Sequence, residues 1–318
     1  MLRASLLVSP RPAALLLRRA FARSGKELAQ KLAPHVPAGI DATVDERYGD
    51  GADALLDVLR PAAATEPLPA LVWVHGGAFV GGSKDELRGW FSVVAANGYA
   101  VVAPRYSLAP EHRYPTPPRQ VMTALAHVQR NAGRLGIDAT RIVLGGDSAG
   151  GHIAAQVAAL ATDPVYAEAV AIEPTLAPER LRGAVLACGA FDLTVTNAPT
   201  AAGRRFLTTV LWAYSGKRDF LGVPGFANAS IVDHVSPAFP PSFVTVGNAD
   251  PLREHSETLV ERLRANGVEV ETLFYPAGHE PPLGHEYQFD LDTAEGRLFL
   301  DRMLAFLAVR TRTDPAGR

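Results

Sequence analysis

Residues 141–151, Arg-Ile-Val-Leu-Gly-Gly-Asp-Ser-Ala-Gly-Gly, set the architecture predicted for this chain. The apolar run before Gly145 predicts a short buried strand, and the alanine-rich run 152–160 predicts a helix with an apolar face. Glycines at 146 and 150 allow a sharp turn between the two, because a Cβ would obstruct the close passage of the chain. A serine held between them, Ser148, is typical of a nucleophile elbow. We therefore predict Ser148 as a catalytic nucleophile.

Length and composition restrict the fold class and the partners. With 318 residues, of which 47% are hydrophobic, the chain can bury the core of one large α/β domain with appendages. Its 31 basic and 33 acidic residues nearly balance, so no overall field favours nucleic acid. The single cysteine, Cys188, excludes an intrachain disulfide and fits a reducing compartment such as the cytoplasm. Because it lies in an apolar run, Cys188 is expected to be a core thiol.

The N-terminal residues 1–40 hold seven basic residues and one acidic residue, Glu27. The apolar run 13–17 is too short for a secretory signal, and no stretch approaches the roughly 20 apolar residues of a membrane-spanning helix. Residues 13–32 predict an amphipathic helix that covers its own domain. A transit peptide, or contact of this basic helix with an acidic membrane surface, remains an alternative.

Apolar runs and helical patterns alternate along most of the chain. Residues 42–48 and 54–60 predict two antiparallel strands joined by the turn at 49–51. Further strands are predicted at 70–75, 99–103, 141–144, 182–188, 242–246 and 268–275, with helices at 87–97, 118–135, 152–162 and 254–266. This alternation predicts right-handed βαβ units around a mostly parallel sheet flanked by helices.

One segment interrupts the alternation. Residues 192–240 form an insertion with weak periodicity and several glycines, prolines and aromatic residues. We interpret it, together with residues 1–40, as a helical cap over the carboxyl ends of the strands, where ligands bind in open parallel sheets. Residues 41–318 would then form the catalytic domain.

An elbow serine needs a histidine to accept its proton and a carboxylate to orient that histidine. Asp250 follows the predicted strand 242–246, so we expect its carboxylate at the edge of the sheet that holds Ser148, although it could instead cap the next helix. His279 and His285 both follow the last strand. His285 lies nearer the final helix, which we expect to begin at Asp292 with Glu295 completing a capping box. This position favours His285 as the base, and His279 stays an alternative.

Backbone amides could stabilise the charge that develops on a substrate oxygen. One donor is Ala149, directly after the nucleophile. The others lie in the glycine-rich loop 75–79, where Gly76 and Gly77 follow a predicted strand. A role limited to the turn is the alternative for these two glycines.

The sequence does not match the motifs of three other kinds of site. Residues 77–84 place Ser83 before Lys84 and so miss the phosphate-binding loop pattern. The run from His279 has Leu283 where a second zinc-binding histidine is required. No dinucleotide-binding fingerprint follows an early strand. We therefore expect neither a metal nor a cofactor.

Four motifs together resemble the hormone-sensitive-lipase-like family of α/β-hydrolases, in its bacterial esterase branch. They are His-Gly-Gly-Ala-Phe at 75–79, Tyr-Ser-Leu-Ala-Pro-Glu-His-Arg-Tyr-Pro at 106–115, Gly-Asp-Ser-Ala-Gly-Gly at 146–151 and Asp-Pro-Leu-Arg at 250–253. The resemblance covers about residues 70–308. It implies an α/β-hydrolase fold with an eight-stranded sheet and a cap built from the N-terminus and the insertion after the sixth strand.

The resemblance also implies a function. Ser148 would be the nucleophile, Asp250 the acid, a late histidine the base, and Gly76, Gly77 and Ala149 the oxyanion region of a carboxylesterase that hydrolyses small-molecule esters with short acyl groups. A lipase or an amidase would share this machinery. A receptor that binds a ligand on a hydrolase scaffold without turnover is an alternative of another class.

Three positions depart from the family pattern. The third glycine of the oxyanion motif is Ala78, which would narrow the acyl side without removing an amide. Ser107 replaces an arginine, so any salt bridge of that arginine is absent. The usual His-Gly-Phe near the end of the chain is His285-Glu286-Tyr287 here.

Overall fold

The computed structural model describes residues 9–195 and 200–313. Three predicted ranges therefore extend beyond the described residues. Residues 1–8 of the N-terminal cap segment, residues 196–199 of the cap insertion and residues 314–318 of the catalytic domain belong to the part that is not described.

The core of the molecule is an eight-stranded sheet with the strand order β1-β2-β4-β3-β5-β6-β7-β8. Strand β2 pairs with β1 and β4 in antiparallel fashion, and the other pairs are parallel. The strands are β1 (Ile40–Arg47), β2 (Leu55–Pro61), β3 (Leu68–Val74), β4 (Ala100–Pro104), β5 (Ile137–Asp147), β6 (Leu181–Ala187), β7 (Ser242–Val246) and β8 (Val270–Phe274). The predicted hairpin and mostly parallel sheet are confirmed.

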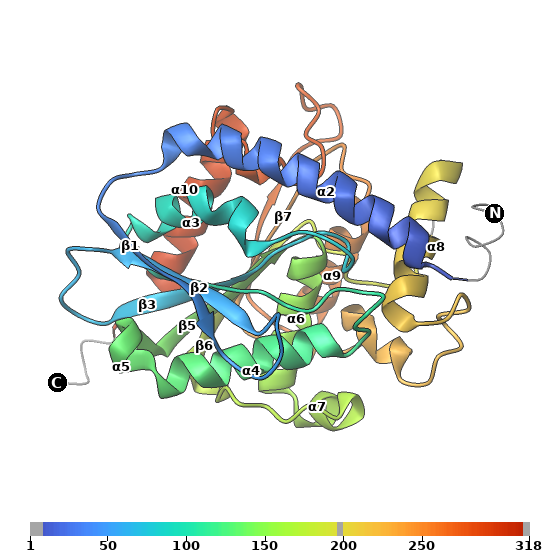
Figure 1. Ribbon diagram of the computed structural model, residues 1–318, viewed down its shortest axis with the longest axis horizontal. Helices are drawn as coiled ribbons and strands as arrows, with labels where there is room; N and C mark the ends of the chain where they lie inside the picture. The colour runs from blue at the N-terminus through green and yellow to red at the C-terminus, as the bar shows by residue number, and fades with distance from the viewer. Residues whose placement is uncertain (1–8, 196–199, 314–318) are drawn as a thin grey trace.

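Helices cover both faces of this sheet (Figure 1). The α-helices are α2 (Arg11–Leu32), α3 (Arg88–Ala95), α4 (Thr116–Arg130), α5 (Ala132–Leu135), α6 (Ala149–Thr162), α7 (Pro164–Val170), α8 (Ala201–Ser215), α9 (Arg253–Ala265) and α10 (Ala294–Arg310). Short 3₁₀ helices are η1 (Ala33–His35), η2 (Lys84–Leu87), η3 (Pro178–Arg180), η4 (Phe226–Ala229), η5 (Ile231–Asp233) and η6 (Tyr287–Phe289).

The sheet separates two hydrophobic cores. Side chains of one face pack with α3 and α10, and those of the other face pack with α4, α6 and α9. Successive residues of β5 alternate between them, since Val143 belongs to the first core and Leu144 to the second. Burial on both faces explains why the parallel strands are continuous apolar runs in the sequence.

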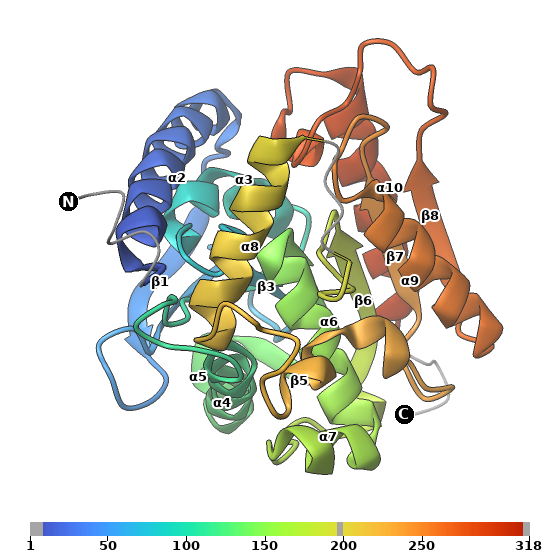
Figure 2. The same ribbon diagram turned by 90° about the vertical axis from the view of Figure 1, so that its right-hand side faces the viewer.

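Helices α2 and α8 come together although they lie far apart in the sequence (Figure 2). Phe21 of α2 meets Phe206 of α8 edge to face, with ring centroids 6.5 Å apart. Arg18 also attaches α2 to the domain, because its guanidinium donates to the carbonyl oxygens of Val80 and Ala109 at 2.8 Å. Helix α2 thus packs on its own domain.

A buried ion cluster attaches η2 to strand β2. Lys84 is 1% exposed and its Nζ lies 2.6 Å from Asp57 Oδ1 and 2.8 Å from Asp45 Oδ1. Arg88 at the start of α3 donates to the other oxygen of Asp57 at 2.9 Å. Lys84 is the last residue of the run 77–84, which does not match the phosphate-binding loop pattern. Its ion pairs instead hold the segment after loop 75–79 against the sheet.

The start of the final helix differs from the prediction. Helix α10 is capped by Thr293, whose Oγ1 accepts the amide of Gly296 at 3.0 Å, and not by Asp292. Asp292 contacts His35 at 3.0 Å instead. Glu295 completes no capping box, because its carboxylate contacts His279.

Within residues 9–195 and 200–313, no helix is both long enough and apolar enough to cross a membrane.

Replacement of Asp57 by alanine is expected to lower the free energy of unfolding by about 3 kcal/mol, because it leaves a buried ammonium group partly uncompensated. Urea unfolding followed by circular dichroism measures this change. Arg23→Ala is the control, since the Arg23–Glu27 pair has side chains 85% and 61% exposed, and we expect a loss within about 0.5 kcal/mol. Equal losses in both variants would contradict a structural role for the cluster.

Candidate active site

Ser148 lies in a strained turn between β5 and α6, with φ of 52° and ψ of −122°. The turn is tight enough to require glycine on both sides. A Cβ on Gly146 would lie 2.5 Å from the carbonyl of Gly150, and one on Gly150 would lie 2.0 Å from the carbonyl oxygen of Val74. This geometry is that of a nucleophile elbow, in which strain is accepted so that the hydroxyl points away from the sheet.

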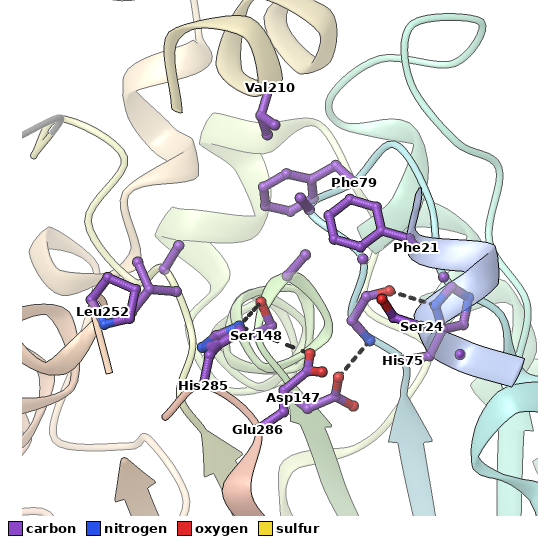
Figure 3. Close-up of a pocket in the computed structure, with 18 of the residues that line it drawn as sticks. Phe21, Ser24, His75, Phe79, Asp147, Ser148, Val210, Leu252, His285 and Glu286 are labelled. Atoms are coloured by element: carbon purple, nitrogen blue, oxygen red, sulfur yellow. Dashed lines mark hydrogen bonds and ion pairs between the residues drawn. The ribbon is translucent and has the colours of Figure 1, made fainter. Parts of the chain in front are cut away.

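His285 connects Ser148, which lies beside it in Figure 3, to Asp250. Its Nε2 lies 2.8 Å from Ser148 Oγ, and its Nδ1 lies 2.9 Å from Asp250 Oδ2. A carboxylate accepts only, so Nδ1 donates to Asp250 and the lone pair of Nε2 is left to accept the serine hydroxyl. The second oxygen of Asp250 accepts the amide of Leu252 at 2.8 Å, which fixes the carboxylate. The three predicted side chains are thus joined by two hydrogen bonds, with His285 between Ser148 and Asp250.

His279, the alternative base, lies elsewhere. Its Nε2 contacts Glu295 Oε1 at 3.1 Å, and its ring packs on Tyr275 with centroids 4.6 Å apart. The structure therefore brings His285, and not His279, to Ser148.

Cys188 is a neighbour of this group that the sequence did not indicate. Its sulfur, a nitrogen of His285 and a carboxylate oxygen of Asp250 all lie within 4.8 Å of one another. The thiol is fully buried, and burial raises its pKa. Strand β6 ends just before Cys188 and pairs with β7, which leads to Asp250. The strand order could therefore have predicted that Cys188 lies near Asp250. These three groups have the chemistry of metal ligands, but His285 and Asp250 are already bonded to each other.

The imidazole of His285 is poised to hold a proton. Burial lowers the pKa of His285, but the neighbouring Cys188 and the hydrogen bond to Asp250 outweigh it, and the pKa is raised well above the ordinary value of 6.5. A fixed carboxylate such as that of Asp250 is a favourable neighbour for an imidazolium.

The oxyanion loop differs from the prediction at Gly76. Its amide donates to Asp147 Oδ2 at 2.8 Å, while Asp147 Oδ1 accepts the indole N–H of Trp73 at 2.8 Å. The amide of Gly76 is therefore already used by a buried carboxyl group. Gly77 and Ala149, the other two predicted donors, line the cavity over Ser148, and so does Ala78.

Ala78 fills the position of the third family glycine with a left-handed backbone, at φ of 54°. The chain turns with positive φ at Gly77, Ala78 and Phe79 in succession. Before this turn, His75 stacks on Tyr106 with centroids 4.3 Å apart, and the Tyr106 hydroxyl donates to the His75 carbonyl at 3.0 Å. These contacts hold the start of the loop.

Ser107, at the position of the family arginine, makes a different contact. Its hydroxyl donates to Asp53 at 3.1 Å, and its amide donates to Gln120 at 2.7 Å. The loop after β4 is thus attached to the β1–β2 turn region without an arginine.

A cavity of about 560 Å³ lies over Ser148. Its walls are mostly apolar and come from α2, α8 and the loops after β3 and β7; they include Phe21, Leu28, Phe79, Phe206, Val210, Leu211 and Leu252. Phe79 stacks on the buried Tyr214 with centroids 4.0 Å apart.

Comparison with known proteins shows the family and the fold. The family model described as alpha/beta hydrolase fold matches residues 71–280, which is more than half of the chain. The chain belongs to the hormone-sensitive-lipase-like family of α/β-hydrolases. The chain is 33% identical to the esterase LipC of Mycobacterium tuberculosis over 240 residues. The match covers 73% of this chain and 58% of LipC. The chain is 32% identical over 256 residues to the carboxylesterase NlhH of the same species, covering 74% of this chain and 73% of NlhH.

Solved structures share the fold over nearly the whole length. Esterase B from Lactobacillus rhamnosis superposes with a TM-score of 0.79 at 22% identity, covering 94% of this hydrolase and 96% of that chain. At this identity the likeness shows the fold. The fold class expected from the sequence is confirmed.

A fluorophosphonate probe is expected to label Ser148, because the unprotonated form of His285, whose Nε2 lies 2.8 Å from Ser148 Oγ, accepts the serine proton. His285→Ala removes that acceptor and should reduce the labelling rate at least 10²-fold, whereas His279→Ala should leave the rate within about twofold. Mass spectrometry of the labelled peptide identifies the labelled residue and, followed over time, measures the labelling rate of each variant. An equally large loss in a folded His279→Ala protein would contradict the assignment of the base.

Proposed function

We propose that this α/β-hydrolase is a serine carboxylesterase that acts on short-acyl esters through an acyl-enzyme intermediate. The observation that carries the proposal is the chain of two hydrogen bonds from Ser148 through His285 to Asp250, at 2.8 and 2.9 Å. The printed names of LipC and NlhH, an esterase and a carboxylesterase, support it.

In the first half of the reaction, Ser148 Oγ attacks the ester carbonyl carbon while its proton passes to His285 Nε2. The carbonyl electrons move onto oxygen, and the amides of Gly77, Ala78 and Ala149 are the donors proposed to stabilise that charge. Asp250 stabilises the imidazolium that forms. As the carbonyl re-forms, the C–O bond to the alcohol breaks and His285 gives its proton to the departing oxygen.

In the second half, water takes the place of the alcohol. His285 accepts a proton from the water as its oxygen bonds to the acyl carbon. The tetrahedral intermediate then expels Ser148 Oγ, which regains a proton from His285. A carboxylic acid leaves, and the free enzyme is restored.

Preference for short acyl groups is proposed from the packed aromatic side chains of the cavity wall. Phe21 and Phe206, which contact each other, and Phe79, which stacks on Tyr214, all line the cavity. A long acyl chain would have to separate these packed aromatic side chains, which a short chain avoids.

Two other readings share part of this geometry. A lipase or an amidase would use the same three residues. A receptor function has a precedent, because the rice gibberellin receptor GID1 is 34% identical over 183 residues, which are 46% of this chain. The complete hydrogen-bond chain to Ser148 favours turnover over binding alone.

Hydrolysis of p-nitrophenyl esters tests the function directly. The wild type is expected to act on the butyrate with kcat/KM at least about tenfold above the laurate, because the longer chain must displace packed aromatic side chains. Ser148→Ala should lower kcat on the butyrate by about 10⁴-fold or more, since the nucleophile is lost. Undiminished turnover in that variant would overturn the proposal, and saturable binding of esters without turnover by the wild type would favour a receptor.

The pH dependence of kcat/KM should report His285. A protonated imidazole cannot accept the serine proton, so the rate falls as pH decreases through the pKa of His285. Because that pKa is raised, the fall should already occur above pH 6.5. Asp250→Asn removes the carboxylate that favours imidazolium, so the acidic limb should shift to lower pH while the maximal rate drops by roughly 10⁴-fold. An acidic limb unchanged by this substitution would contradict the assignment.

A further inference from the structure

Glu286 occupies the position at which this chain departs from the family's His-Gly-Phe. Its backbone has φ of 62° and ψ of 27°, a left-handed conformation that favours glycine. Its side chain is 34% exposed and lines the cavity over Ser148. Glu286 Oε1 lies 3.9 Å from His285 Nε2, the atom that accepts the Ser148 hydroxyl. A carboxyl group therefore stands beside the reacting atoms (Figure 3).

Glu286 also faces the buried Asp147 across Gly76. A Cβ on Gly76 would lie 2.3 Å from Asp147 Oδ2 and 2.9 Å from Glu286 Oε1, so the missing side chain makes room for both carboxyl groups. Two carboxyl groups this close do not both ionise. Burial and the neighbouring Glu286 raise the pKa of Asp147 well above its usual range. The pair therefore places negative charge at the wall of the cavity, on the side that Glu286 lines.

Little positive charge compensates this side of the cavity. Glu86 of η2 is the next carboxyl group; burial, and then Glu286 and Asp85, raise its pKa to about 7. Among the described residues that line the cavity, Lys31 is the one lysine, and no arginine is present. The Nζ of Lys31 lies 3.5 Å from a carboxylate oxygen of Asp290. The other groups facing Glu286 are His285, the hydroxyl of Tyr106 and the thiol of Cys188. A permanent cation in this place would have to come from the substrate.

The chemistry indicates which half of the substrate meets Glu286. His285 Nε2 gives its proton to the departing alcohol oxygen, so that oxygen must lie next to Nε2 in the reaction. We propose that Glu286 is a specificity-determining residue that favours esters whose alcohol carries an ammonium group a few atoms from the ester oxygen. This inference rests on the proposed esterase function and names its substrate class.

Two esters of the same shape and different charge provide the test. Butyrylcholine carries a trimethylammonium group, and 3,3-dimethylbutyl butyrate carries a neutral tert-butyl group in its place. In the wild type, kcat/KM for the cationic ester should exceed that for the neutral ester by about tenfold, because opposite charges attract strongly in a partly desolvated cavity. Glu286→Gln keeps the size and a hydrogen bond to Asp147 while it removes the charge, and should bring the ratio near one.

The matched control is Glu280→Gln, which makes the same chemical change at an exposed position of the same loop. Its ratio should equal that of the wild type. A ratio unchanged by Glu286→Gln would overturn the proposal. So would an equal loss of both esters in that variant, because this would mark a structural role.

Binding of choline separates this proposal from the esterase function. Isothermal titration of the Ser148→Ala protein with choline chloride should give a Kd at least about fivefold weaker when Glu286→Gln is added. Absence of ester hydrolysis by the wild type would overturn the proposed function, and choline binding would still test Glu286. Equal choline affinity with and without the Glu286 charge would overturn the inference on its own.

Discussion

The close approach of α6 to the end of β3 is the constraint on which the site depends. Gly150 lies so near the carbonyl oxygen of Val74 that a Cβ would come within 2.0 Å of it. This contact brings the first turn of α6, with the amide of Ala149, against the loop that follows β3. The nucleophile and its surrounding amides are therefore placed by one packing contact between glycine backbone and strand end. A side chain at this position would separate them.

A second constraint acts through Asp147, the residue before the nucleophile. Its two oxygens accept N–H groups from Trp73 and Gly76, both at 2.8 Å, so one buried carboxyl group links β5 to the end of β3 and to the oxyanion loop. The amide of Gly76 is thereby turned to Asp147, and the donors left for a substrate are those further along the loop. The turn at Ser148 and the oxyanion loop are thus joined by the side chain of Asp147 as well as by the backbone contact at Gly150.

The sequence predicted the features that depend on local patterns. Continuous apolar runs indicated parallel strands, and chain order with strand ends placed Asp250 and His285 at the edge that holds Ser148. The remaining features depend on contacts between distant segments. The orientation of Gly76 follows from a side chain 71 residues away, and Cys188 reaches His285 only because β6 and β7 are neighbours. Thr293, and not Asp292, caps α10 because Asp292 contacts His35, a residue more than 250 positions earlier in the chain.

The charges around Ser148 form one coupled system. During the proposed reaction His285 becomes positive and the substrate oxygen becomes negative, so a carboxylate near the imidazole stabilises one charge and opposes the other. Asp250 touches only the Nδ1 side, where it favours the imidazolium. Asp147 contacts the oxyanion loop, and a second full negative charge there would oppose the substrate oxygen. Burial and the proximity of Glu286 raise the pKa of Asp147, which lessens that conflict. The carboxyl group of Glu286 lies beside His285 Nε2, the side where the alcohol departs, so the arrangement that protects the oxyanion also places an acidic group against the leaving half of the substrate.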